Sequence, residues 1–182
     1  QPSISELVKA LLDRPRAIIA PLQYRSAGLK TVSYKTSYCL WLGFLSMSKI
    51  IEDIPSRLIK VRLITGGRGV ILTREMINEL GYLDEVRFPH YGADHDFYFK
   101  ASRRGVELFL CPAAHVDVDD TSTSSAELYS QLSLSGFLRT FSDVRSHRNV
   151  KVVSRLFYRH FRPRAFFFIG IFLYYLRYFL MY

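Results

Sequence analysis

The sequence is poor in cysteine: its 182 residues include only Cys39 and Cys111, which lie far apart and form no CxxC pair. This spacing gives no support for a disulfide framework or a zinc knuckle, and it fits a reducing compartment. The sequence also lacks a phosphate-binding fingerprint. Its Gly-rich segment, GGRG at 66–69, is not GxGxxG and has neither the Lys nor the Ser/Thr of a P-loop. GGRG alone is therefore weak evidence and more often forms a simple turn.

Recognisable nucleic-acid-binding modules are absent as well, including the stacking motifs of RRM domains. The formal net charge of +9 and the isoelectric point near 9.7 would suit a nucleic acid. The excess of basic residues, however, lies mostly in the C-terminal third, so their location is more informative than their total. The sequence therefore predicts no nucleic-acid partner.

The N-terminal segment QPSISELVKALL lacks both the basic start and the apolar run of a signal peptide. The chain does have enough apolar residues for a core, since 49% of its residues are hydrophobic and 23% are charged. These proportions are typical of a globular domain. We expect one α/β domain, residues 1–140, followed by a distinct tail, residues 141–182.

Start and stop signals predict alternating helices and strands. The segment SISELVKALLDRP begins with a capping box of Ser3 and Glu6 and ends at Pro15, which predicts a short amphipathic helix. RAIIAP then predicts a buried strand. SYCLWLGFLSMSKII is compatible with a pair of strands or a buried helix, because its apolar run has no clear periodicity.

The second half of the domain has clearer signals. RLITGGRGVIL predicts a strand and a loop, and a helix follows that Thr73 caps and Gly81 ends. A further helix is expected from about Asp94 to Arg104, with Gly105 after it. VELFLCP predicts a strand, after which AAHVDVDD alternates apolar and polar residues. The order of helices and strands indicates an α/β layer.

The motif FPHYGADHDFYFKASRRG, residues 88–105, places Asp94 and Asp96 at the start of a helix, after a loop with Gly92. A carboxylate there can accept a proton, as is required when a hydroxyl attacks the anomeric carbon of an activated sugar. The glycine would let the backbone approach a ligand closely. The alternative is that both acids only cap a surface helix.

Acidic residues cluster again after the last expected strand. Asp117, Asp119 and Asp120 have the oxygen ligands that Mg²⁺ or Mn²⁺ prefer, and His115 could add an imidazole. A solvated acidic loop explains the same pattern. The residues alone leave both interpretations open.

The motifs between residues 64 and 125 follow a distinctive order: a Gly-rich strand end, a helix closing in GYLDE, HYGAD, the FYFKASRRG helix, a strand ending at Pro112, and an acid before Ser/Thr. This order resembles the C-terminal half of the catalytic domain of inverting family 2 glycosyltransferases, which have the GT-A fold. The resemblance implies a Rossmann-like mixed sheet flanked by helices. It also implies transfer of a sugar from a nucleotide-sugar donor to an acceptor hydroxyl, with inversion.

The resemblance assigns roles to individual residues. Asp94 matches the catalytic base that deprotonates the acceptor hydroxyl, although Ala93 stands where the family usually has Glu. Asp96 falls where the family often has a second acid. The other candidates for acceptor or donor binding are Gly66, Gly67, Arg68, His90 and Tyr91.

The metal assignment also follows from the resemblance. Many members place a histidine after the last strand to hold the metal and diphosphate, but Val118 occupies that place and His115 comes too early. Asp119, one residue later, is expected to take over this role together with Asp117. The expected ion is Mg²⁺ or Mn²⁺.

The resemblance further implies a donor-binding half upstream. The family's nucleotide-binding strand and its acidic DxD-type metal motif should precede Gln1, and nothing in the 182 residues matches them. QPSISELVKALL resembles the helix that follows that motif. We therefore expect a fragment that begins just after it and that does not bind the donor alone.

The tail contains no acid between Arg145 and Arg164, where every charged side chain is basic. Helical spacing separates an apolar side from a basic side, which is the pattern of a helix lying on an anionic membrane. The apolar side consists of Val152, Leu156 and Phe157, and the basic side of Arg148, Lys151, Arg155 and Arg159. An RNA-binding helix would look similar.

The run AFFFIGIFLYYLRYFLMY that follows is near the lower limit of membrane-spanning length and is broken only by Arg177, which can snorkel to lipid headgroups. A buried core helix is the alternative. We expect a peripheral or monotopic protein at the cytoplasmic face of a membrane, acting on a surface glycan or a lipid-linked glycan. The alternative function is a non-catalytic, membrane-associated interaction domain derived from a glycosyltransferase, which Ala93 and the expected loss of the donor half favour.

Overall fold

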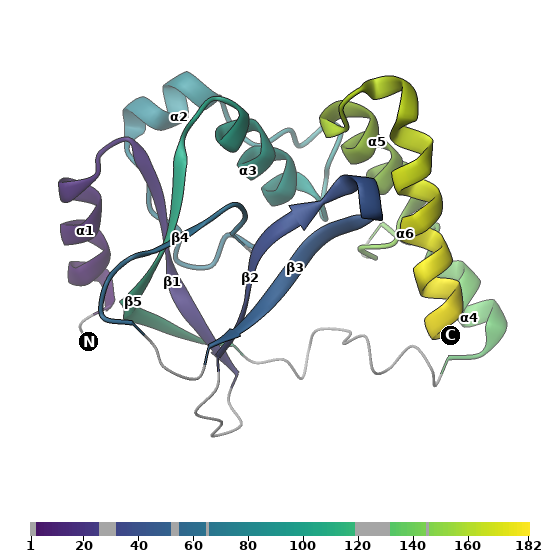
Figure 1. Cartoon of the computed structure of the whole chain (residues 1–182), viewed down its shortest axis with the longest axis horizontal. Helices are drawn as coiled ribbons and strands as arrows, with labels where there is room; N and C mark the ends of the chain where they lie inside the picture. The colour runs from purple at the N-terminus through teal and green to yellow at the C-terminus, as the bar shows by residue number, and fades with distance from the viewer. Residues whose placement is uncertain (1–2, 26–31, 52–54, 65, 119–131, 145) are drawn as a thin grey trace.

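The computed structural model describes residues 3–25, 32–51, 55–64, 66–118, 132–144 and 146–182. It contains a three-stranded mixed sheet in the order β1-β5-β4 (Figure 1). Strand β1 (Ala17–Arg25) is parallel to β5 (Glu107–Val118), and β4 (Ile59–Val61) is antiparallel to β5. The expected mixed α/β sheet flanked by helices is confirmed, and GT-A topology stays a proposal.

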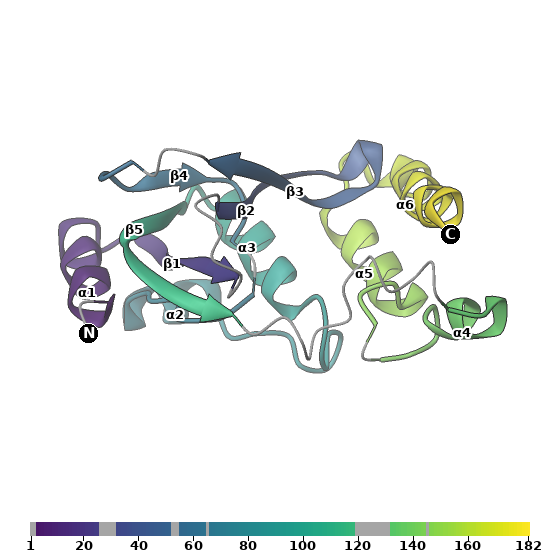
Figure 2. The same ribbon diagram turned by 90° about the horizontal axis from the view of Figure 1, so that it is seen from below.

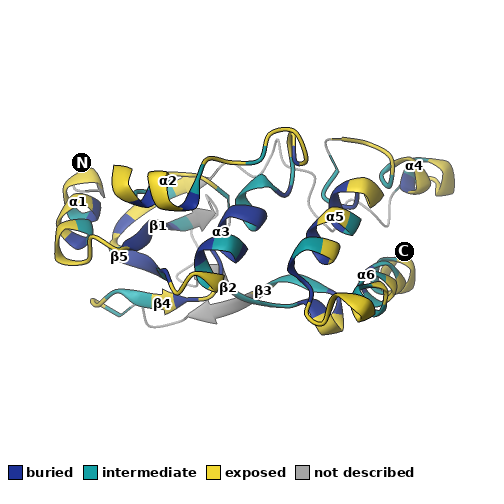
Figure 3. Ribbon diagram, turned by 90° about the horizontal axis from the view of Figure 1, so that it is seen from above, coloured by how far each residue is buried: buried dark blue, intermediate teal, exposed yellow. Residues whose placement is uncertain are grey.

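Helices cover both faces of this sheet. They are α1 (Ser3–Asp13), α2 (Arg74–Leu80) and α3 (Ala93–Arg103). Ile18 and Ala20 of β1 pack in a cluster that includes side chains of α2 and α3, whereas Ile19 packs with Leu7 of α1. Successive strand residues point to opposite faces, so a strand covered on both sides is a continuous apolar run. The strands and the inner side of α3 accordingly hold many of the buried residues in Figure 3.

The pairing of β1 with β5 shifts where two prolines lie. Pro21 is opposite Cys111, but Leu22 is opposite His115, so residues 112–114 have no counterpart on β1. Proline has no N–H to donate, and strands tolerate it at irregularities of this kind. The strand that was expected to end at Pro112 therefore continues beyond this proline to Val118.

The ambiguous segment after β1 forms two antiparallel strands rather than a helix. Strand β2 (Val32–Cys39) pairs with β3 (Phe44–Ile51), and the short 3-10 helix η1 (Leu40–Leu42) connects them. Gly43 follows η1 with φ of +69°, a left-handed conformation that glycine adopts without strain. Figure 1 shows this turn extending toward the C-terminal helices.

The ends of α2 and α3 lie where the sequence signals predict them. Thr73 Oγ1 accepts a hydrogen bond from the Met76 N–H at 3.3 Å, and Gly81 follows the last turn of α2. Helix α3 begins after Gly92 and ends before Gly105, which has φ of +76°. These predictions are confirmed because each signal acts within one helical turn.

The C-terminal helices are α4 (Leu134–Arg139), α5 (Val150–His160), the 3-10 helix η3 (Arg164–Phe166) and α6 (Phe167–Met181), which Figure 2 shows at the end of the molecule away from α1. Of these, α5 and α6 pack on the same core as the sheet. Val153 and Phe157 of α5 and Tyr174 of α6 belong to the cluster that contains Ile18 of β1. Residues expected to form a separate tail therefore complete the core of the domain.

The apolar side of α5 does not face a membrane, which corrects the expectation for this helix. Val152, Leu156 and Phe157 are at most 5% exposed. Val152 and Leu156 pack with Phe88, which precedes α3, and Phe157 lies in the main core cluster. Helical periodicity identified the apolar side, but it does not distinguish burial in protein from burial in lipid.

Arg148, expected on the basic side of that helix, is fully buried. Its guanidinium lies over the rings of Phe137 and Tyr178, at 5.3 and 4.7 Å from their centroids. It also donates a hydrogen bond to Thr140 Oγ1 at 3.3 Å. This arginine therefore ties α4 and α6 to the start of α5.

Helix α6 contacts the turn between β2 and β3 through glycines. A Cβ added at Gly170 would overlap the carbonyl oxygen of Leu40 and lie 2.6 Å from Phe157 Cε1. A Cβ added at Gly43 would overlap the backbone of Tyr174. The two backbones approach this closely because neither position has a side chain.

We predict that Gly170→Ala lowers the free energy of unfolding by about 1–3 kcal/mol, because the methyl group forces α6 away from η1. The matched control is Gly67→Ala, where a Cβ would meet no atom within 4 Å. That variant should change stability by less than about 0.5 kcal/mol. Urea unfolding followed by circular dichroism measures both, and equal stability of the two variants would contradict the close packing of α6.

Candidate functional site

Asp94 lies in the first turn of α3, where the helix dipole stabilises a negative charge. Its Oδ1 accepts a hydrogen bond from the His95 backbone N–H at 2.9 Å and lies 3.2 Å from His95 Nδ1. The Gly66 N–H also donates to the carboxylate. One turn later, the Tyr98 hydroxyl donates to the Gly66 carbonyl oxygen at 2.8 Å. Both polar backbone groups of Gly66 therefore fasten the GGRG loop to α3.

These contacts keep Asp94 ionised. Burial raises the pKa of Asp94, but the hydrogen bond and charge of His95, together with the N–H groups of His95 and Gly66, lower that pKa to about 2. The Asp94 side chain is still 30% exposed. Burial, and then the charge of Asp94, raise the pKa of Tyr98, so its hydroxyl remains a donor at neutral pH. The result is an ionised, oriented and partly accessible carboxylate, which is positioned to accept a proton although its lowered pKa makes it a weaker base than an ordinary aspartate.

Asp96, two residues later, has the opposite environment. It is 1% exposed, and its Oδ1 lies 2.7 Å from His160 Nε2 and 3.3 Å from Arg159 Nη1. Residues two apart on a helix project in nearly opposite directions, so the two acids cannot share one site. Asp96, expected to contact donor or acceptor, is instead enclosed against α5. No local pattern indicates His160 as its partner, because 64 residues separate the two.

The contacts of His160 indicate its protonation state. Arg103 Nη1 lies 3.4 Å from His160 Nδ1. A guanidinium can only donate, so Nδ1 is the acceptor and the Nε2–H donates to Asp96. Burial lowers the pKa of His160, although Asp96 acts in the opposite direction. Both observations describe a neutral histidine.

The residues just before α3 lie near the surface. His90 is exposed and Tyr91 is half-buried, with their ring centroids 4.8 Å apart. Gly92 was expected to let a ligand approach, but α5 occupies that space. A Cβ added there would lie 2.9 Å from Val152 Cγ1 and 3.1 Å from Leu156 Cδ1. Gly92 therefore serves the packing of α5 on α3.

The GGRG loop is open on its outer side. Gly67 and Arg68 are exposed, and a Cβ added at Gly66 or Gly67 would meet no atom within 4 Å. Of the expected site residues, the structure thus joins Gly66 to Asp94. Gly67 and Arg68 follow in the same loop.

The expected metal site is only partly within the described residues. Asp117 and His115 are exposed on β5, and Asp119 lies outside the described ranges. Within those ranges, no group of three His, Cys, Asp or Glu side chains is placed to hold a metal ion. The described residues therefore supply no complete ligand set, and a site at Asp117 and Asp119 stays a prediction.

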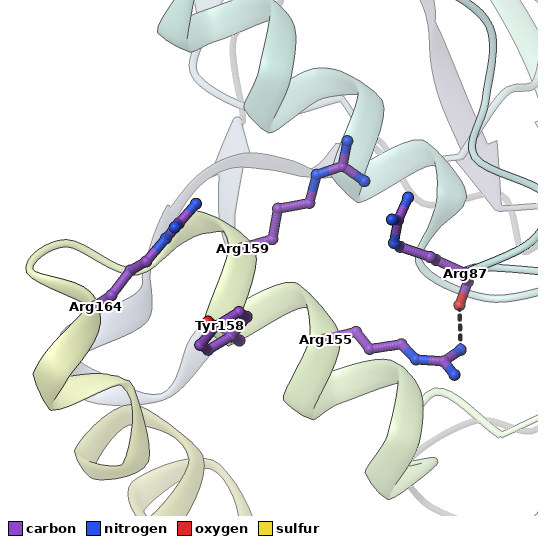
Figure 4. A pocket seen from close by; sticks show the side chains of 5 residues that line it. All are labelled: Arg87, Arg155, Tyr158, Arg159 and Arg164. Atoms are coloured by element: carbon purple, nitrogen blue, oxygen red, sulfur yellow. Dashed lines mark hydrogen bonds between the residues drawn. The ribbon is translucent and has the colours of Figure 1, made fainter.

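Basic side chains from distant segments gather around a pocket of about 290 Å³ between α5 and the loop before α3 (Figure 4). Its lining residues, which we call the arginine pocket, are Arg87, Arg155, Tyr158, Arg159 and Arg164. Arg155 Nη1 donates to the Arg87 carbonyl oxygen at 2.9 Å. The basic residues of α5 are evident in the sequence, but Arg87 lies 68 residues before Arg155 and no local signal connects the two.

Asp84 fixes two of these arginines. Its Oδ2 accepts hydrogen bonds from Nη1 of Arg87 and from Nη1 of Arg159, both at 2.8 Å. The hydrogen bond from Arg87 lowers the pKa of Asp84 to about 2, and burial opposes this effect. Asp84 thus stays charged and holds one wall of the pocket in place.

No family model matches the sequence, and no curated protein matches it. The resemblance to family 2 glycosyltransferases therefore rests only on the order of the motifs in the sequence and stays a prediction.

We predict that the free energy of unfolding falls as the pH is lowered from about 7 to about 5, partly because of His160. Its pKa in the fold lies below the ordinary value of 6.5. Below that pH the unfolded chain binds more protons than the folded protein, so acid favours unfolding. In the fold, the groups facing His160 are Asp96, Arg103 and Arg159.

The measurement is chemical unfolding over this pH range for the native protein and for His160→Gln, whose amide can still donate to Asp96. The variant should show a shallower pH dependence. The exposed residue His90 provides the control, His90→Gln, which should keep the native slope. An unchanged slope in His160→Gln would show that His160 does not titrate as described.

Proposed function

We propose that this chain forms the acceptor side of a glycosyltransferase with a GT-A-like fold, which transfers a sugar from a nucleotide-sugar to an acceptor hydroxyl with inversion. The observation that carries the proposal is the Asp94 carboxylate, which is ionised, 30% exposed, and oriented by His95 and Gly66. The order of the motifs supports the class of reaction.

In this reaction Asp94 acts as the general base. The acceptor oxygen forms a bond to the anomeric carbon while its proton passes to the Asp94 carboxylate. The bond from that carbon to the nucleotide diphosphate breaks on the opposite side, which inverts the centre. The N–H groups of His95 and Gly66 hold the carboxylate in one orientation, so proton transfer requires no rearrangement of the base.

Residues close to Asp94 in the chain or in the adjoining GGRG loop are the candidates for substrate contact. Gly67, Arg68 and His90 are exposed, and Tyr91 is half-buried. Asp96 supports the site from inside by tying α3 to α5. Mg²⁺ or Mn²⁺ at Asp119 and Asp117 would neutralise the leaving diphosphate, and no step above depends on it.

The exposed side of α6 suits a membrane surface. Residues Arg164–Met181 are long and apolar enough to be membrane-associated, with a mean hydropathy of 1.4 and only 11% of the segment buried. The large exposed side chains form one stripe: Phe168, Phe172, Leu176, Phe179 and Leu180. The opposite side, with Gly170 and Tyr174, packs on the protein. We therefore propose a monotopic helix lying on the cytoplasmic leaflet, with a surface or lipid-linked glycan as acceptor.

The second candidate function is a non-catalytic membrane-associated interaction domain. The observation that favours it is Ala93, the first residue of α3, at the place where the family usually has Glu. Both functions require membrane binding, but only the transferase requires the charge of Asp94.

We predict that Asp94→Asn lowers the rate of sugar transfer by about 10²–10⁴-fold, because the amide cannot accept the proton. The assay uses the longer protein in which the chain follows the donor-binding half that the resemblance implies. Folding should be retained, since the Asn carbonyl oxygen can still accept the hydrogen bond from the His95 N–H.

The control for this assay is Glu75→Gln, which neutralises an exposed acid in the first turn of α2. It should leave the transfer rate within about twofold of the native rate, as expected for a surface substitution far from the reacting atoms. Near-native transfer by Asp94→Asn would reduce Asp94 to a helix-capping residue and favour the second candidate function.

We predict that Phe172→Ser combined with Leu180→Ser weakens binding to anionic liposomes at least about tenfold, because both side chains would leave lipid. They are 63% and 78% exposed. The control is Ile4→Ser with Leu12→Ser, at 75% and 76% exposure on α1, which Figure 1 places at the other end of the molecule.

Liposome flotation measures binding, and circular dichroism confirms folding. Equal binding by the two double variants would show that α6 does not engage the bilayer. Substitution is preferable to deleting residues 145–182, because a deletion would remove Val153 and Phe157 from the core.

A further inference from the structure

The arginine pocket combines four cations from three segments of the chain. Arg87 comes from the loop before α3, Arg155 and Arg159 lie one helical turn apart on α5, and Arg164 begins η3. Figure 4 shows Arg155 extending toward Arg87 and Arg159 extending toward α3. Like charges four residues apart on a helix destabilise it. The fold therefore places like charges next to one another on α5.

The nearby acids neutralise only part of this positive charge. Asp84 pairs with Arg87 and Arg159, and Asp96 also lies 3.3 Å from Arg159. Within the described part of the chain, no acid pairs with Arg155 or Arg164. Four arginines thus face two acids, which leaves an excess of two positive charges around the pocket.

One charged group nearby reflects the excess of arginines. The pKa of Arg162 is lowered by burial and by the charges of Arg103 and Arg164. The pKa of Lys100 is lowered by burial, but there the charge of Asp96 raises it while the charges of Arg159 and Arg104 lower it. A doubly charged anion in the pocket would relieve this repulsion.

The shape and the lining of the pocket suit a small anion with an apolar attachment. The volume of about 290 Å³ is at the lower end of ligand pockets, which suits a headgroup rather than a whole nucleotide-sugar. Guanidinium groups bind phosphate oxygens in a planar, bidentate manner. Tyr158 adds a hydroxyl, and its ring contacts Phe167 of α6 at 5.4 Å between centroids.

The pocket lies where the apolar surface of α6 begins. Arg164, in η3, leads directly into α6, and Phe166 and Phe168 are 44% and 57% exposed. An anion in the pocket would therefore have its charge on the arginines and apolar side chains of the protein beside it. Lipid headgroups combine these two properties.

We propose that the arginine pocket binds a phosphate monoester or diphosphate group. The adjoining exposed side of α6 favours a lipid headgroup as the source of that group, rather than a soluble phosphate. Phosphate binding at this pocket does not depend on sugar transfer. The further step, that the bound lipid is the lipid-linked acceptor, rests on the proposed function.

The test compares two double variants of the chain that lose the same charge. The pocket variant is Arg155→Gln with Arg164→Gln, and the control is Arg57→Gln with Arg74→Gln, two exposed arginines outside the pocket. Flotation uses phosphatidylcholine vesicles containing phosphatidic acid, a phosphate monoester, or phosphatidylserine, a phosphodiester, at matched surface charge. In a second arm, inorganic diphosphate is titrated calorimetrically into each protein in phosphate-free buffer.

The pocket variant should bind phosphatidic acid vesicles at least about tenfold more weakly than the native protein, and the control variant should lose much less. Diphosphate binding that is lost in the pocket variant, without a change in vesicle binding, would keep the phosphate site but exclude a lipid as its source. The proposal would be overturned if the pocket variant lost as much binding to phosphatidylserine vesicles as to phosphatidic acid vesicles. It would also be overturned if the pocket variant and the control variant bound equally in both arms.

Circular dichroism shows whether both double variants remain folded. If the pocket variant is less stable than the native protein, Arg155→Gln and Arg164→Gln can each be measured as single variants. Asp94→Asn should leave vesicle and diphosphate binding unchanged. Retained binding together with near-native sugar transfer by Asp94→Asn would therefore contradict the proposed function and leave the phosphate site standing.

Discussion

The buried carboxylate of Asp96 is the constraint on which the C-terminal half of the structure depends. It is 1% exposed, and the groups that stabilise its charge, the Nε2–H of neutral His160 and the guanidinium of Arg159, both come from α5. Removing one partner of a buried ion pair typically costs about 3–5 kcal/mol, because the remaining charge has no solvent around it. Helix α5 must therefore dock on α3 whenever the domain is folded. This docking in turn brings Arg155 and Arg159 beside Arg87.

The geometry of this helical turn explains why Asp94 and Asp96 have different environments. Asp94 and Asp96 project from nearly opposite sides of α3. The side with Asp94 meets the GGRG loop and keeps access to solvent, whereas the side with Asp96 meets α5. Because α5 fixes one side of the turn and Gly66 the other, α3 cannot rotate, and the orientation of Asp94 follows from the burial of Asp96.

Local signals in the sequence were sufficient for the parts of the fold that depend on local interactions. The Thr73 cap, Gly81 and the apolar run before Pro21 each act within a few residues, and the structure has these elements at the expected places. The segment that became β2 and β3 was ambiguous because its apolar residues gain their partners across a hairpin and from α6. Asp94 with Gly66 could be anticipated from motif order, but the partner of Asp96 could not, since nothing near it in sequence indicates His160.

The basic stretch shows why charge composition alone does not determine function. In sequence, Arg148, Arg155, Arg159 and Arg164 look equivalent. In the structure, Arg148 is buried against aromatic rings and Arg159 is paired with acids. Arg155 and Arg164 pair with no acid within the described residues, and both line one pocket at the start of α6. Cations committed to the fold contribute little to binding, because an anion would have to displace their partners. The two that remain uncompensated lie beside an exposed apolar helix, so attraction for an anion and attraction for lipid act at the same end of the molecule.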